Sequence, residues 1–153
     1  MIEGLAAGDA LAALWNGAFG TTYAFLSHTL VRATPLLLLG LSVALAFRSG
    51  VLNIGAEGQF LAGAAAATAV ALTCGSLPKF VVVVGMTAAG LLGGAAWAGI
   101  AAVLKRRFGV LEVISTIMLN FVALYVVQWL VHGPLREPTG TFPKTVTFEP
   151  SGH

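Results

Sequence analysis

The sequence predicts an all-α protein: a polytopic transmembrane helical bundle with about four spanning helices and a short N-terminal interfacial helix. Of the 153 residues, 58% are hydrophobic and only 9% are charged, whereas soluble domains carry roughly 25% charged residues. The charges are also spaced far apart. Uncharged runs extend from Glu57 to Lys79, from Lys79 to Lys105 and from Glu112 to Arg136. Each run is long enough for the roughly 20 residues of a membrane-spanning helix.

The N-terminal segment, residues 1–30, is expected to lie outside the cytoplasm or at the membrane interface. After Asp9 it is uncharged, but polar residues and glycines dilute its apolar content. Asp9 is predicted to be the N-cap of a short interfacial helix, with a break at Gly17–Gly20. The large apolar side chains of that helix are Leu11, Leu14 and Trp15.

Four spans are predicted near residues 31–47, 55–74, 80–104 and 112–131. The first is short for a hydrocarbon core of roughly 30 Å and is expected to extend upstream. The basic cluster KRRFG, Lys105–Gly109, is predicted to form a short cytoplasmic loop between the last two spans, by the positive-inside rule. Residues 132–153 are rich in Pro, Gly and Thr and are predicted to form an extracytoplasmic loop.

The third span contains glycines at intervals that favour close helix packing. Gly90 and Gly94 are four residues apart, and Gly99 stands four residues after Ala95. Small residues let helix backbones approach closely in lipid, where packing drives association. Because Ala and Gly are abundant in this chain, such pairs also arise by chance. We expect Gly90, Gly94 and Gly99 to lie at a helix–helix interface.

A polar stripe marks the fourth span. Glu112, Thr116 and Asn120 are four residues apart in turn, so they share one helix face. Polar groups left unsatisfied in hydrocarbon cost several kcal/mol, and this face should therefore point into the bundle. Two roles remain open for it: hydrogen bonds between helices, or the lining of a polar pathway.

The stretch FRSGVLNIGAEGQF, Phe47–Phe60, interrupts the apolar pattern between the first two spans. In one interpretation it is a tight turn: Gly50 turns the chain, Asn53 caps the next helix and Glu57 lies in the first turn. In the other it is a break in a discontinuous helix, where Asn53, Glu57 and Gln59 meet a polar cargo. It is not a phosphate loop, because no Gly-Lys-Ser/Thr sequence follows the glycines.

Two long segments resemble one known family. They are LVRATPLLLLGLSVALAFRSGVLNIGAEGQFLAGA, Leu30–Ala64, and KRRFGVLEVISTIMLNFVALYVVQWLVHGPLR, Lys105–Arg136. They resemble the permease subunits of ATP-binding-cassette importers, in the branch for nucleosides and simple sugars that is related to ribose and branched-chain amino-acid permeases. One departure is Leu111, where the family's motif has Asn before EVISTIMLN.

The resemblance implies a multi-pass protein of a prokaryotic cell membrane that carries a nucleoside or simple sugar. Its implied partners are a second permease chain, a cytoplasmic ATP-binding subunit that hydrolyses ATP, and an extracytoplasmic solute-binding protein. This chain would itself bind no cofactor. Such permeases are longer, so the chain is expected to be an N-terminal-half fragment without the first span. The resemblance also favours Asn53, Glu57, Gln59, Thr116 and Asn120 as residues of the pathway or the bundle core.

Other function classes are less consistent with the sequence. No Cys/His spacing indicates a metal site, and the few basic residues do not indicate nucleic acid binding. An intramembrane enzyme would need a nucleophile with a base or paired acids, which the chain lacks. The alternative that stays open is a membrane assembly or regulatory protein without transport, or an inactive permease fragment.

Overall fold

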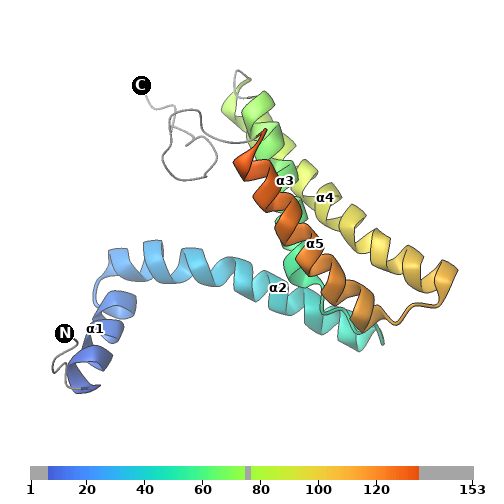
Figure 1. The fold of residues 1–153 in the computed structure, drawn as a ribbon. Helices are drawn as coiled ribbons and strands as arrows, with labels where there is room; N and C mark the ends of the chain where they lie inside the picture. The colour runs from blue at the N-terminus through green and yellow to red at the C-terminus, as the bar shows by residue number, and fades with distance from the viewer. Residues whose placement is uncertain (1–6, 75–76, 135–153) are drawn as a thin grey trace. The chain divides into compact units, whose positions relative to one another are not determined.

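The computed structural model describes residues 7–74 and 77–134. Within these ranges every regular element is a helix, which confirms the predicted all-α class (Figure 1). The elements are α1 (Ala7–Phe19), the π-helical η1 (Ala24–Leu30), α2 (Val31–Arg48), α3 (Ala56–Thr73), α4 (Lys79–Phe108) and α5 (Glu112–His132). Residues 1–6 and most of the predicted loop 132–153 lie outside the described residues.

The chain forms two compact units, Met1–Ala44 and Leu45–His153. In the first, α1 packs against η1: the Thr29 hydroxyl donates to the Ala18 carbonyl at 2.8 Å. The prediction that Asp9 is an N-cap is wrong, because α1 begins at Ala7 and Asp9 lies in its first turn. A carboxylate is favoured there by the helix dipole without capping the helix. The predicted break at Gly17–Gly20 is correct only at its end, because α1 continues through Gly17 to Phe19 and is interrupted at Gly20.

Within the described residues, three helices are long and apolar enough to cross a membrane: Ala24–Arg48, Lys79–Phe108 and Glu112–His132. The first therefore begins upstream of residue 31, and Pro35 lies inside it. The remaining predicted span corresponds to α3, which has 18 residues and carries Glu57 in its first turn. The number of spans is thus close to the four that were predicted.

In the second unit α3 packs against both α4 and α5 (Figure 1). Its buried residues are all small: Ala56, Gly58, Gly63 and Ala71. A Cβ placed on Gly63 would lie 2.7 Å from the backbone oxygen of Gly90, so the two helix backbones nearly touch. Close contact of this kind is how helices associate in lipid. Many large side chains of α4 and α5, by contrast, face outward.

The prediction that the basic cluster forms a loop is wrong. Lys105, Arg106 and Arg107 are in the last turn of α4, which ends where Gly109 adopts a left-handed conformation with φ 67°. Cations at a helix C-terminus interact favourably with the helix dipole, which explains why the helix continues through them. The connection to α5 is correspondingly short.

Candidate functional site

The stretch between α2 and α3 is an irregular segment, residues 51–55, which follows a turn and which we call the connecting segment. Gly50 makes that turn with φ 76°, a conformation that favours glycine. Gly55 is the N-cap of α3, with no side-chain hydrogen bond from the cap residue. The interpretation of Asn53 as the N-cap of α3 is therefore wrong. The side-chain oxygen of Asn53 instead accepts a hydrogen bond from the Gly55 amide at 2.9 Å.

The polar stripe of α5 contacts the connecting segment. The Glu112 carboxylate accepts from the Leu52 amide at 3.2 Å, and the Thr116 hydroxyl accepts from the Ile54 amide at 3.4 Å. The Asn120 side chain donates to the Ile54 carbonyl at 3.0 Å and accepts from the Gly58 amide at 2.8 Å. We call Glu112, Thr116 and Asn120, with the backbone groups they bind, the polar ladder.

The ladder follows the period of α5. Residues four apart on a helix share one face and are separated by a rise of about 6 Å. Glu112, Thr116 and Asn120 therefore meet successive backbone groups of the connecting segment. Glycine makes the approach possible: a Cβ on Gly55 would lie 2.9 Å from the Thr116 Cβ, and one on Gly58 would lie 2.8 Å from the Asn120 oxygen.

The ladder also provides a hydrogen-bond partner for the backbone at the start of α3. The first backbone amides of a helix have no partner within the helix. Asn120 binds one of them, Gly58, from a residue far away in the sequence. A helix that starts inside an apolar bundle is thereby capped by its neighbour rather than by its own side chain.

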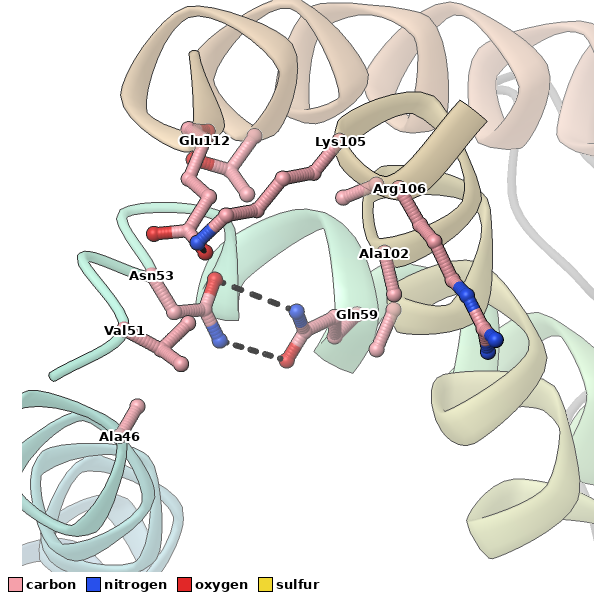
Figure 2. A pocket seen from close by; sticks show the side chains of 11 residues that line it. Ala46, Val51, Asn53, Gln59, Ala102, Lys105, Arg106 and Glu112 are labelled. Carbon is pink, nitrogen blue, oxygen red and sulfur yellow. Dashed lines mark hydrogen bonds and ion pairs between the residues drawn. The ribbon is translucent and has the colours of Figure 1, made fainter. Parts of the chain in front are cut away.

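A pair of side-chain amides lies beside the ladder. The Asn53 amide nitrogen donates to the Gln59 oxygen at 3.3 Å, and the Gln59 nitrogen donates to the Asn53 oxygen at 3.2 Å (Figure 2). We call this the amide pair. It joins the connecting segment to α3, and each partner keeps hydrogen-bonding capacity beyond the pair.

The amide pair lies on the wall of a cavity of about 560 Å³, shown in Figure 2. Small apolar residues form much of the lining, and polar groups come from the amide pair, the ladder and the end of α4. The apolar lining residues are Ala46, Val51, Ala98, Ala101 and Ala102. The polar and charged lining residues are Asn53, Gln59, Thr116, Lys105, Arg106 and Glu112. Such a mixture of apolar walls with a few converging polar groups is typical of small-molecule sites.

An ion pair between Lys105 and Glu112 lies at the edge of this cavity. It joins the last turn of α4 to the first turn of α5, while the second carboxylate oxygen of Glu112 binds the Leu52 amide. Lys105 is half exposed, so the pair itself contributes little to stability. It fixes the carboxylate that begins the polar ladder.

The predicted site residues fall into distinct places. Asn53, Gln59 and Thr116 line the cavity, and Asn120 belongs to the ladder. Glu57 is exposed on α3 and belongs neither to the cavity lining nor to the ladder. Sequence reasoning did not assign Lys105 to the site; its place seven residues before Glu112, across a glycine, was the available signal.

The three glycines predicted to lie at a helix–helix interface differ in what they contact. Gly90 and Gly94 lie against α3, near the backbone of Gly63 and Gln59 respectively. Gly93, which was not predicted, makes the closest approach of the three, since its Cβ would lie 2.8 Å from that of Ala66. A Cβ on Gly99 would have no described neighbour within 4 Å.

Metal ligands do not gather in this site or elsewhere in the described part of the chain. Within residues 7–74 and 77–134, no cluster of three His, Cys, Asp or Glu residues could hold a metal ion. The polar groups of the cavity are two amides, a hydroxyl, the Lys105–Glu112 ion pair and the Arg106 guanidinium. The amides and the hydroxyl suit the binding of a polar molecule through hydrogen bonds.

Comparison with known proteins identifies the family. Residues 25–153 match the model of the branched-chain amino acid transport system permease component. The chain belongs to this permease family. Its members are permease components of transporters. Since the described part of the chain has three helices long and apolar enough to cross a membrane, the chain is a multi-pass protein of the plasma membrane. No solved structure matches the chain.

Three curated relatives illustrate the similarity. The glucose ABC transporter permease protein of Haloferax volcanii is 45% identical over 123 residues, which cover 80% of this chain and 32% of the relative. The guanosine ABC transporter permease protein of Bacillus subtilis is 38% identical over 137 residues, 90% of this chain and 39% of the relative. The nucleoside ABC transporter permease protein of Lactococcus lactis subsp. cremoris is 35% identical over 112 residues, 73% of this chain and 31% of the relative. The chain thus spans about a third of their length.

Proposed function

We propose that this chain forms part of the translocation pathway of an ATP-binding-cassette importer for a nucleoside or simple sugar. The family and the names of the relatives support the class of transporter and of solute. In this proposal the chain works with a second permease chain, a cytoplasmic ATP-binding subunit that hydrolyses the nucleotide, and an extracytoplasmic solute-binding protein. It supplies part of the path and performs no chemistry of its own.

The observation that carries the proposal is the amide pair on the wall of the cavity. Paired primary amides present a donor and an acceptor side by side, and so do the edge of a nucleobase and the vicinal hydroxyls of a sugar. A polar solute can therefore exchange its own hydrogen bonds for those of Asn53 and Gln59 without leaving a polar group unpaired. The apolar alanine walls of the cavity offer few competing contacts.

The other predicted residues take supporting roles in this proposal. Thr116 and Asn120 hold the connecting segment in place, because their polar atoms are already engaged by the backbone of Ile54 and Gly58. Asn53 and Gln59 meet the solute. Glu57 is exposed on α3 and is assigned to contacts with other parts of the transporter.

The test is ATP-dependent uptake by the full-length transporter carrying Gln59→Leu. Leucine has similar volume but no polar atom, so we expect uptake to fall by about tenfold or more, as when one hydrogen-bonding group of a site is lost. Uptake should be measured for both a nucleoside and a hexose. A group that contacts the solute should change the ratio between the two, which a general loss of folded protein would not do.

Gln128→Leu is the matched control, because Gln128 is an exposed glutamine of α5 that does not line the cavity. It should transport as the unmodified protein does. Equal amounts of both variants in the membrane, bound to the ATP-binding subunit, are required for the comparison. Unchanged uptake by Gln59→Leu would contradict the assignment of the amide pair. Failure of the unmodified transporter to copurify with an ATP-binding subunit would contradict the transporter class itself.

A further inference from the structure

A second charged surface lies at the end of α4, beside the cavity described above. Val103, Arg106, Arg107 and Phe108 line a hollow of about 570 Å³ there. Phe108 is 72% exposed and Val103 is 56% exposed. We call these four residues the arginine surface. Only Arg106 is shared with the cavity that contains the amide pair.

The charge of the arginine surface is not balanced within the described part of the chain. Lys105 pairs with Glu112, but neither Arg106 nor Arg107 has a described acidic side chain within 4 Å. Two guanidinium groups next to each other in sequence therefore remain available to an anion. Arginine binds phosphate through parallel N–H donors, which makes it the preferred residue for this ligand.

The length of α4 places this surface at the depth of lipid headgroups. With 30 residues the helix is about 45 Å long, whereas the hydrocarbon core is roughly 30 Å thick and the whole bilayer about 40–45 Å. A helix of this length that crosses the membrane extends beyond the hydrocarbon core. The last turn of α4, which holds both arginines, consequently lies among the headgroups.

An apolar strip leads from the arginines toward the hydrocarbon core. Ile100 and Val103 stand seven and four residues before Arg107, so the three residues share one helix face. Ile100 and Val103 are both exposed. The same face of α4 thus presents positive charge at its end and apolar side chains in the turns that precede it.

We propose that the arginine surface binds the phosphate headgroup of an anionic phospholipid, with an acyl chain along Ile100 and Val103. The charge, the depth and the adjoining apolar strip fit one molecule that is anionic at one end and apolar along its length. An acidic protein segment would be attracted by the arginines, but it would not use the apolar strip. The proposal is independent of the transported solute.

The test is native mass spectrometry of the purified full-length transporter, delipidated and titrated with phosphatidylglycerol or phosphatidylcholine. We expect preferential retention of phosphatidylglycerol. R106Q/R107Q should weaken that retention by about tenfold or more, since each basic residue near an anionic surface contributes roughly a fivefold change in affinity. R106K/R107K keeps the charge but loses the parallel N–H donors of arginine, so its retention of phosphatidylglycerol should be intermediate.

Arg48→Gln is the matched control, because Arg48 is also an exposed arginine at a helix end but lies outside the arginine surface. It should retain phosphatidylglycerol normally. Equal retention of the two lipids, or undiminished retention by R106Q/R107Q, would overturn the proposal. Loss of the ATP-binding subunit with unchanged lipid retention would also overturn it and assign the surface to a protein partner. If R106Q/R107Q does not assemble, R106K/R107K decides: retention equal to the unmodified protein would contradict the proposal.

Discussion

At the scale of single residues, Asn120 has the most demanding position in the polar ladder. One end of its side chain must accept from the Gly58 amide while the other donates to the Ile54 carbonyl. Only an amide side chain offers both groups at a fixed separation, and carboxylates or hydroxyls cannot replace it in full. Asn120 therefore joins the start of α3, the connecting segment and α5 at one point.

Asn120→Leu is expected to destabilise the protein by about 1–3 kcal/mol, because Gly58 and Ile54 each lose a partner in the packed bundle. Reversible unfolding of the full-length permease in mixed detergent micelles measures the change. Gln128→Leu, at an exposed position of the same helix, controls for the general effect of replacing an amide by leucine. If both variants unfold alike, the ladder has no energetic role at Asn120.

The ladder was only partly predictable from the sequence. The spacing of Glu112, Thr116 and Asn120 predicted one shared face that points into the bundle, because the period of a helix dictates it. The partner of that face was not predictable. It is the backbone of Leu52 and Ile54, whose amides carry no sequence signal, and the contact joins residues about 60 positions apart. For the same reason neither interpretation of Asn53, as a helix cap or as a group that meets a polar cargo, predicted its pairing with Gln59.

At the scale of helices, the contact of α3 with α4 depends on the absence of side chains. Gly63→Ala should destabilise the protein by about 1–3 kcal/mol, because the new Cβ would lie 2.7 Å from the Gly90 carbonyl oxygen, a backbone atom that cannot rotate away. Unfolding in detergent measures the effect. Gly99→Ala is the control: its Cβ meets no described atom within 4 Å, so it should be neutral or stabilise by up to about 1 kcal/mol. Equal destabilisation by both would contradict the packing argument.

The start of α5 offers a stabilising change. Leu111 is its N-cap, in an extended conformation with φ −60° and ψ 128°, and its side chain makes no cap hydrogen bond. Leu111→Asn should raise the free energy of unfolding by roughly 0.5–2 kcal/mol, since Asn accepts from a free amide of the first turn. Leu111→Ala, which cannot cap, should give no such gain. A thermal unfolding midpoint that is no higher for the Asn variant than for the Ala variant would refute this prediction.

The positions of the helices in the sequence were easier to predict than the side of each helix that packs against its neighbours. Long uncharged runs predicted the spans because length and apolar content suffice for that. The helices of the second unit are apolar on most sides, so no stripe of large apolar residues marked the side that packs. The observed ends of the helices differ from the predicted ends where a second physical effect acts. The last turn of α4 continues through Lys105–Arg107 because cations suit a helix C-terminus, whereas charge alone had suggested a loop.

At the scale of the whole molecule, the distribution of side-chain sizes separates the inside of the second unit from its outside. The buried positions of α3 are Ala and Gly, while Leu91, Leu92 and Phe121 are exposed on its neighbours. This is the reverse of a water-soluble protein, whose large apolar side chains are buried. In lipid there is no penalty for exposing them, and close backbone packing stabilises the centre instead.

The orientation of this unit in the membrane remains a prediction, and one native thiol tests it. The positive-inside rule assigns the basic end of α4 to the cytoplasm. Cys74, the C-cap of α3, precedes α4 and lies near its opposite end. In a full-length permease with Cys74 as its single cysteine, a membrane-impermeant maleimide added to intact cells should label it.

The complementary variant carries Arg106→Cys with Cys74 replaced by Ser. About 45 Å of helix separates the two ends of α4, more than the hydrocarbon thickness, so the two thiols must face opposite sides. The Arg106→Cys thiol should react only after the membrane is permeabilised. The reverse labelling pattern would invert the orientation and place the cavity, whose edge holds Lys105 and Arg106, toward the outside. Labelling of both thiols in intact cells would show that α4 does not cross the membrane, and the transporter proposal would fail with it.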